Sequence, residues 1–180
     1  MHASVAQLDR ALVSGTKGRG FESLRAHHYF AMSYMYLFTL EIDPLDVGRT
    51  YDELPPHLTL ASRFVCDISF EGVAELVQPL FARIAPIPLV FGEVIEIGPK
   101  NIKAYMVSSS AEQQLHSMLS MLLDTVAVAY QYPQFIGKGH RPHVTLREGT
   151  RFAPDNTMIT STAYLIEVVQ KKELFKVCLS

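Results

Sequence analysis

One short motif, Pro-His-x-Thr-Leu, occurs twice in this chain, at residues 56–60 and at residues 142–146. In a β-strand, alternate side chains point to the same face, so each copy places an imidazole beside a hydroxyl, with Leu or Val on the opposite face. The repeat predicts two strands with equivalent polar pairs. It constrains the fold to one that brings His57 and His143 together.

Composition limits the class of protein. The 180 residues are 48% apolar and 19% charged, which is ordinary for one globular domain. A net charge of −2 argues against a protein that holds long nucleic acid on a broad basic face. Cys66 and Cys178 lack the spacing of a zinc or redox motif, so we expect both to be reduced. No apolar run is long enough for a membrane helix, and we expect a cytoplasmic monomer with no stable protein partner.

The first 31 residues differ from the rest of the chain. Residues 14–20 are polar and glycine-rich and lack the periodicity of a core element. We therefore expect residues 1–31 to be a disordered leader outside the fold. Residues 21–23 also resemble the translation of a transfer-RNA gene, which suggests that the leader is an artefact of gene annotation and makes Met32 and Met35 candidate true starts. An Arg-rich targeting segment is the alternative.

The remaining residues, 32–180, read as one α+β domain. Strand patterns cover residues 36–42, 57–64, 87–97, 103–107, 143–147, 163–170 and 174–179, and the last two form an expected hairpin that turns at Lys171-Lys172. Helical spacing covers residues 70–84, where Pro79 should bend or break the helix, and residues 110–129, with Ser110 as the expected cap. Each half of the chain therefore holds one motif strand, further strands and one helix. This predicts two pseudo-symmetric lobes of antiparallel sheet, with helices outside and the two motifs in a central cleft.

Paired histidines suit phosphodiester chemistry. That chemistry needs a base for the nucleophile, an acid for the leaving oxygen and donors for the phosphate oxygens. Histidine has an unperturbed pKa of about 6.5, so His57 and His143 can share the two proton transfers. The hydroxyls of Thr59 and Thr145 can donate to phosphate oxygens. The scheme requires no metal and no other cofactor, and it leaves open which histidine is the base.

A single His-x-Thr segment on a strand is most often structural, but two matching copies in equivalent halves favour a paired site. With these two motifs, the chain resembles the 2H phosphoesterase superfamily, which is named for two His-x-Thr/Ser-x motifs. The resemblance covers about residues 35–180. It implies a two-lobed fold, a metal-independent cyclic phosphodiesterase or 2′-5′ RNA ligase type of activity, and a site of His57, Thr59, His143 and Thr145. The implied substrates are RNA ends with a 2′,3′-cyclic phosphate, 2′-5′-linked oligonucleotides and small cyclic nucleotides.

Arg147 is a candidate phosphate ligand. Many RNA-type members of the superfamily have an arginine five positions after the second histidine, whereas this chain has Arg147 at four and Glu148 at five. In a regular strand, Arg147 would share the face of His143, and Arg63 would share the face of His57. Either arginine can instead turn to solvent at its strand's end.

Several other side chains have two readings. Lys138 and His140 lie in a glycine-flanked loop that either approaches an anion or is a plain flexible connection. We expect Tyr132 and Phe135 to pack in the core, with base stacking as the alternative. His116, in the second helix, is expected at the surface or its boundary.

Two other functions remain open at this point. A metal-dependent hydrolase would use His57, His140 and His143 as ligands, although carboxylates at ligand spacing are missing. A non-catalytic RNA- or nucleotide-binding module would keep the cleft without turnover.

Overall fold

A computed structural model describes residues 34–98, 100–147, 152–169 and 174–179, and for Val169 and residues 174–179 it describes the backbone alone. These residues belong to one compact unit, Ser33–Ser180. The leader expected over residues 1–31 lies outside the described residues, as does the turn expected at Lys171-Lys172. In the described part of the chain, no helix is long and apolar enough to cross a membrane.

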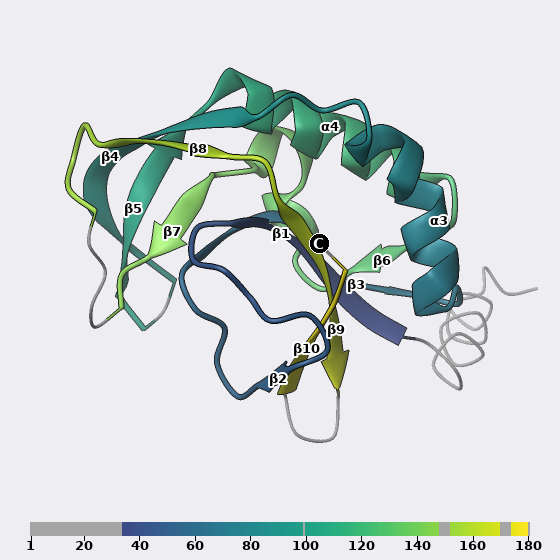
Figure 1. Cartoon of the computed structure of the whole chain (residues 1–180). Coiled ribbons are helices and arrows are strands. Elements are labelled where there is room, and N and C mark those ends of the chain that lie inside the picture. Colours follow the sequence, from purple (N-terminus) through teal and green to yellow (C-terminus); the bar gives the residue numbers. More distant parts are fainter. Residues whose placement is uncertain (1–33, 99, 148–151, 170–173, 180) are drawn as a thin grey trace, which may run out of the picture. The chain divides into compact units, whose positions relative to one another are not determined.

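The described elements are ten strands, two α-helices and two short 3-10 helices (Figure 1). In chain order they are β1 (Tyr34–Glu41), β2 (Thr50–Tyr51), β3 (His57–Cys66), α3 (Phe70–Phe81), β4 (Ile87–Ile97), β5 (Ile102–Ser108), α4 (Ser110–Asp124), β6 (Ala129–Tyr130), η1 (Pro133–Phe135), η2 (Gly137–Gly139), β7 (His143–Thr145), β8 (Thr157–Thr160), β9 (Ala163–Val169) and β10 (Leu174–Leu179).

The strands form one curled antiparallel sheet in the order β2-β10-β9-β1-β3-β7-β5-β4-β8, and β6 adds to β3. The predicted α+β class is confirmed, as is the antiparallel pairing of β9 with β10, and β4 pairs with β5 in the same way. The motif strands β3 and β7 are neighbours near the middle of this order. The sequence pattern does not reveal the short strands β2, β6 and β8, because two to four residues carry too little periodicity.

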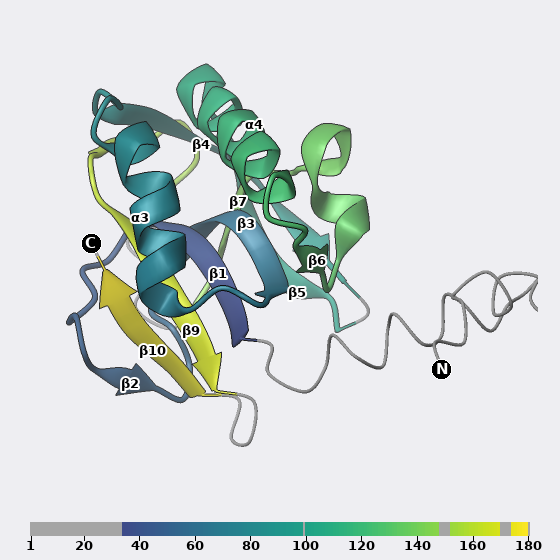
Figure 2. The same cartoon turned by 90° about the vertical axis from the view of Figure 1, so that its right-hand side faces the viewer.

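Both helices cover the same face of the sheet (Figure 2). Val73 and Val77 of α3 and Leu115, Leu119 and Leu123 of α4 are buried against it. They join a core that contains the inward side chains of the strands, which include Phe38, Leu58, Leu60, Phe64, Phe91 and Val144. This face holds most of the buried apolar surface and is therefore the main source of stability.

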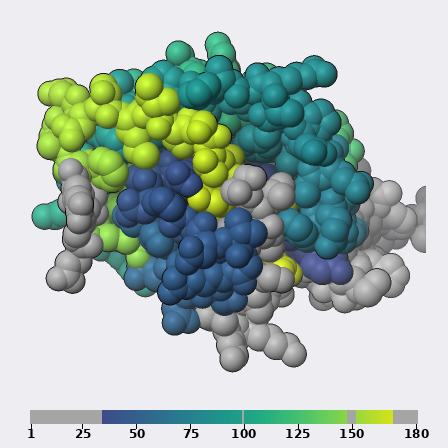
Figure 3. Space-filling model, in the orientation of Figure 1, coloured from purple at the N-terminus to yellow at the C-terminus, as the bar shows by residue number. Residues whose placement is uncertain are grey.

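The other face is covered in part by the segment between β1 and β3. Leu45 and Leu54 of this segment pack against Leu37, Tyr164 and Ile166 in a second apolar cluster. In the space-filling view, this segment, dark blue, forms the surface in front of the sheet (Figure 3). The segment shields β1 and β9 on the face opposite the helices.

Both helices end earlier than the sequence predicts. Of the bend or break expected at Pro79, the break is wrong, because the helix continues through the proline and ends two residues later at Phe81. The second helix ends at Asp124 instead of near residue 129, and its N-cap is Ser109 instead of Ser110. The Ser109 hydroxyl accepts a hydrogen bond from the Glu112 amide at 3.2 Å. Two adjacent serines offer equally good caps, so only the backbone conformation decides between them.

Candidate active site

The two copies of the motif lie side by side in the sheet. Leu58 of β3 and Val144 of β7 are antiparallel partners, and both are 0% exposed on the helix-covered face. One residue to either side of this pair, alternation turns the side chains to the other face. His57 then lies opposite Thr145, and Thr59 lies opposite His143. All four of these polar residues are partly buried.

The two imidazoles are diagonal neighbours in this arrangement. Diagonal positions across an antiparallel pair are about 7–8 Å apart, within reach of one small group placed between them. The two hydroxyls occupy the other diagonal. The structure therefore gathers His57, Thr59, His143 and Thr145 into one polar patch on the face away from the helices.

Each histidine ring is oriented by a carbonyl two residues earlier. Nδ1 of His57 lies 2.8 Å from the Pro55 carbonyl oxygen, and Nδ1 of His143 lies 2.7 Å from the Arg141 carbonyl oxygen. A carbonyl oxygen only accepts, so Nδ1 carries the proton in both rings. Nε2 is then the nitrogen that can exchange a proton with a substrate.

The proline before each histidine sets up this bond. Its ring fixes φ and keeps the chain extended as it enters the strand. The carbonyl of Pro56 accepts from the Asp43 amide at 3.1 Å, and the carbonyl of Pro142 accepts from the Val107 amide at 2.9 Å. In both motifs, the proline carbonyl accepts a hydrogen bond from an amide of a neighbouring segment. The two motifs are therefore alike in their backbone hydrogen bonds as well as in their residues.

The environment of His57 favours its neutral form. Burial is the main reason that the pKa of His57 is lowered, and the positive charges of Arg147 and His143 lower it further. The hydrogen bond to Pro55 acts in the opposite direction. At a given pH, therefore, a larger fraction of His57 is neutral than of an ordinary histidine, whose pKa is about 6.5.

Arg147 lies beyond the second motif strand. The regular strand that was assumed for Arg147 is shorter than expected, because β7 ends at Thr145. Its guanidinium forms an ion pair with Glu53, which belongs to the segment between β1 and β3. Its charge is nevertheless close enough to lower the pKa of His57. Arg147 is thus placed beside the polar patch, while Glu148 lies outside the described residues.

Replacement of Arg147 tests this placement. We expect Arg147→Ala to raise the pKa of His57, because a nearby positive charge no longer opposes protonation of the ring. The measurement is an NMR titration of the His57 imidazole. Arg63→Ala removes the same charge from β3 and is the matched control. An equal shift in both variants, or none in Arg147→Ala, would contradict the placement.

Glu41 and Tyr164 adjoin the patch and were not found by sequence reasoning. Glu41 is the Cα partner of His57 across the β1–β3 pair. The Tyr164 hydroxyl donates to the Glu41 carboxylate and accepts from the Leu45 amide at 3.1 Å. Burial and the bond to Glu41 raise the pKa of Tyr164. Glu41 comes beside His57 only through the register between β1 and β3. A local sequence pattern does not contain that register, so it could not have revealed this pair.

The other candidates from the sequence lie in different surroundings. Tyr132 is 42% exposed and Phe135 is 49% exposed, so the expectation that they pack in the core is wrong. Lys138 is exposed in η2. The regular strand assumed for Arg63 is interrupted, because the register of β3 against β1 shifts twice between Thr59 and Phe64. Cys66 is buried and unpaired, and burial raises its pKa.

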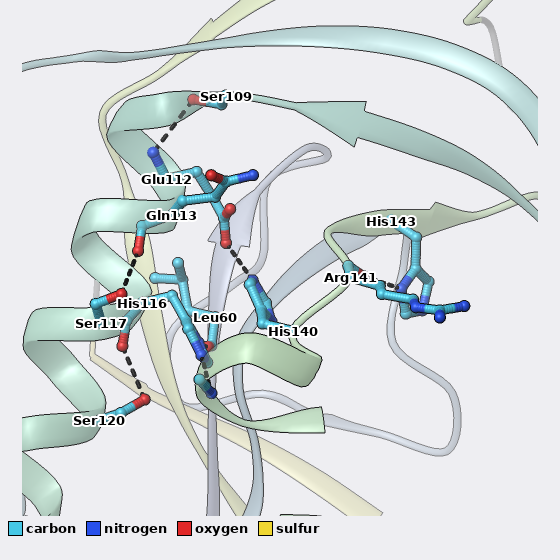
Figure 4. A network of polar contacts seen from close by, with 11 residues as sticks. Leu60, Ser109, Glu112, Gln113, His116, Ser117, Ser120, His140, Arg141 and His143 are labelled. Carbon is cyan, nitrogen blue, oxygen red and sulfur yellow. Dashed lines mark hydrogen bonds and ion pairs between the residues drawn. The ribbon is translucent and has the colours of Figure 1, made fainter. Parts of the chain in front are cut away.

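The metal-ligand set that we considered is not assembled. His140 hydrogen-bonds to Glu112 and stacks on His116, so its ring points to α4, whereas that of His143 does not (Figure 4). In the part of the chain that the structure describes, no three or more His, Cys, Asp or Glu side chains are grouped to hold a metal ion.

A cavity of 470 Å³ lies on the helix-covered side of the sheet, under α3. Phe38, Val77 and Leu165 are among the apolar residues that line it. The histidines of the two motifs do not line it, so this cavity is separate from the candidate site.

Comparison with protein families places the chain among known proteins. The model of the 2′-5′ RNA ligase superfamily matches residues 39–174. This range contains both motifs and Arg147. None of the curated proteins compared with the chain matches it.

Proposed function

Since this chain belongs to the 2′-5′ RNA ligase superfamily, part of the 2H phosphoesterases, we propose that it opens or forms a phosphodiester at an RNA end or nucleotide. Membership supports an enzyme of the phosphoesterase or ligase kind. The proposed substrate is a 2′,3′-cyclic phosphate or a 2′-5′ linkage. The observation that carries the proposal is the antiparallel pairing of the two motifs through Leu58 and Val144.

The proposed hydrolysis of a 2′,3′-cyclic phosphate uses one histidine for each proton transfer. Nε2 of His57 takes a proton from water while the water oxygen forms a bond to phosphorus. The bond from phosphorus to one ribose oxygen breaks, and that oxygen takes a proton from His143. The product is a phosphomonoester with a free neighbouring hydroxyl. Formation of a 2′-5′ linkage follows the same steps with a ribose hydroxyl in place of water.

The lowered pKa of His57 supports its assignment as the base. A base must be neutral at the start of the reaction, and burial together with the charges of Arg147 and His143 favours the neutral form of His57. The acid role then belongs to His143. The two rings return to their starting states when a proton passes back from His57 to His143 through solvent.

The hydroxyls and the nearby arginine are proposed to hold the phosphate. Thr59 and Thr145 lie on the same face as the rings and can donate to the non-bridging oxygens. Arg147 can add a charge-assisted contact, for which the phosphate would compete with Glu53. We further propose that the strands on either side of the β3–β7 pair are the two lobes, with the polar patch of the two motifs between them.

A substrate panel tests the proposal. The panel contains nucleoside 2′,3′-cyclic phosphates, RNA ends with a cyclic phosphate and 2′-5′-linked oligonucleotides, with 3′-5′-linked oligonucleotides as the matched control. We expect turnover of at least one member of the first three groups, equal rates with and without EDTA, and no cleavage of the control. Binding without product from every compound would contradict the proposal and favour a non-catalytic binding module.

A further inference from the structure

A buried polar cluster joins α4 to the turn that precedes the second motif (Figure 4). Glu112, in the first turn of α4, is 0% exposed, and its Oε1 accepts from Nε2 of His140 at 2.7 Å. The His140 ring stacks on His116 with ring centres 3.7 Å apart and planes 5° apart. This cluster, Glu112, His116 and His140, is not part of the polar patch of the two motifs.

The carboxylate of Glu112 depends on this contact. A buried carboxylate is costly unless it is paired and hydrogen-bonded. In a helix that begins Ser-x-x-Glu, the glutamate often bonds back to the cap, but here Oε1 is used by His140. Oε2 has no hydrogen-bond partner in the described part of the chain. The bond to His140 therefore holds this side chain in place.

His116 connects the same turn to the first motif strand. Its Nδ1 donates to the Leu60 carbonyl oxygen, 2.6 Å away, and its Nε2 accepts from the Gly137 amide at 2.9 Å. Because an amide only donates, Nε2 carries no proton and the ring is neutral, and burial, which lowers the pKa of His116, favours the same state. The ring is 2% exposed, so the expectation of a surface or boundary position is wrong.

The residues that this cluster holds in place are sequence neighbours of residues in or next to the two motifs. Leu60 directly follows Thr59 in β3. His140 directly precedes Arg141, whose carbonyl orients the His143 ring. A side chain at Gly139 would place its Cβ 1.9 Å from the Gln134 carbonyl oxygen, so the backbone of the turn packs closely against Gln134 there. Because His140 adjoins Arg141, a displacement of His140 would also move the Arg141 carbonyl that orients the His143 ring.

We propose that Glu112, His116 and His140 are positioning residues that fix the second motif against the first. The inference rests on the proposed phosphoesterase function. It assigns them no contact with substrate: they hold the Arg141 carbonyl, and through it the His143 ring, in the orientation for proton transfer. A misplacement of about 1 Å in such a group costs on the order of 10²-fold in rate.

The test compares two replacements of His140 in the full chain. His140→Phe keeps a ring that stacks on His116 but removes the donor to Glu112, whereas His140→Gln keeps an amide N–H near the position of Nε2. We expect His140→Phe to lower kcat about 10²-fold with KM within about threefold, because the proton-transfer geometry changes and the phosphate contacts do not. His140→Gln should recover most of kcat. Leu123→Ala, which opens the core on the same helix, is the stability control and should leave kcat within about twofold while the protein is folded.

A second readout needs no turnover. In His140→Phe, the NMR signal of the His143 Nδ1 proton should shift or vanish, while the His57 Nδ1 signal stays in place. If the wild-type protein turns over no member of the substrate panel, the proposed function fails and this signal still tests the positioning role. A folded His140→Phe variant with wild-type kcat, or with an unmoved His143 signal, would overturn the inference.

Discussion

Alanine at His57 or His143 is expected to lower the turnover of a 2′,3′-cyclic phosphate about 10²- to 10⁴-fold. Each ring is proposed to carry one proton transfer, and its partner lies across the β3–β7 pair on the same face. The loss should fall mainly on kcat, because the hydroxyls of Thr59 and Thr145 that are proposed to hold the phosphate remain. The measurement is steady-state kinetics of each variant on the best substrate of the panel.

The double variant gives the decisive comparison. Residues that act as a unit are not additive, so His57→Ala with His143→Ala should be little slower than the worse single variant. His28→Ala removes a histidine that precedes residue 39, where the family match begins, and is the control. Turnover at the wild-type rate by the double variant would exclude two-histidine catalysis.

Leu58→Ala is expected to lower the free energy of unfolding by about 2–5 kcal/mol. Leu58 is 0% exposed, and it faces the helices at the position where β3 pairs with Val144 of β7. Its removal leaves a cavity under the strands that carry both motifs. Since domains of this size are stable by about 5–15 kcal/mol, the loss is a large fraction of the total.

Urea unfolding measures this change. The midpoint should fall without a change in slope, because the unfolded surface is nearly the same. Met121→Ala, at a helical side chain that is 72% exposed, is the matched control and should change stability by less than about 0.5 kcal/mol. If Leu58→Ala lowered the free energy of unfolding by as little as Met121→Ala, Leu58 would not be in the core.

Long periodic segments could be predicted from the sequence. β4 has the predicted bounds, Ile87–Ile97, because a run rich in β-branched residues between prolines and a glycine has few alternatives. β1, β3 and the last hairpin differ from their predicted ranges by at most two residues. The His-x-Thr strands were predicted from alternation alone, and their type of chemistry follows from the residues that they carry.

The prediction failed where the outcome depends on distant neighbours. His116 reads as a boundary residue because its helix is polar around it, yet Leu60 and Gly137 supply partners for both ring nitrogens and allow it to be buried. Tyr132 reads as a core residue from its aromatic ring alone, yet it is exposed. Arg147 reads as a strand residue, but β7 is too short to include it.

The sequence by itself determined which side chains alternate on each motif strand, since alternation is a local property of the extended backbone. It also determined the chemistry that a pair of imidazoles and hydroxyls can perform. Only the tertiary structure decided that Leu58 pairs with Val144, which places His57 opposite Thr145, and that carbonyls orient both rings. The physical reason is that register between strands distant in the chain depends on the packing of the whole core, to which each local segment contributes little.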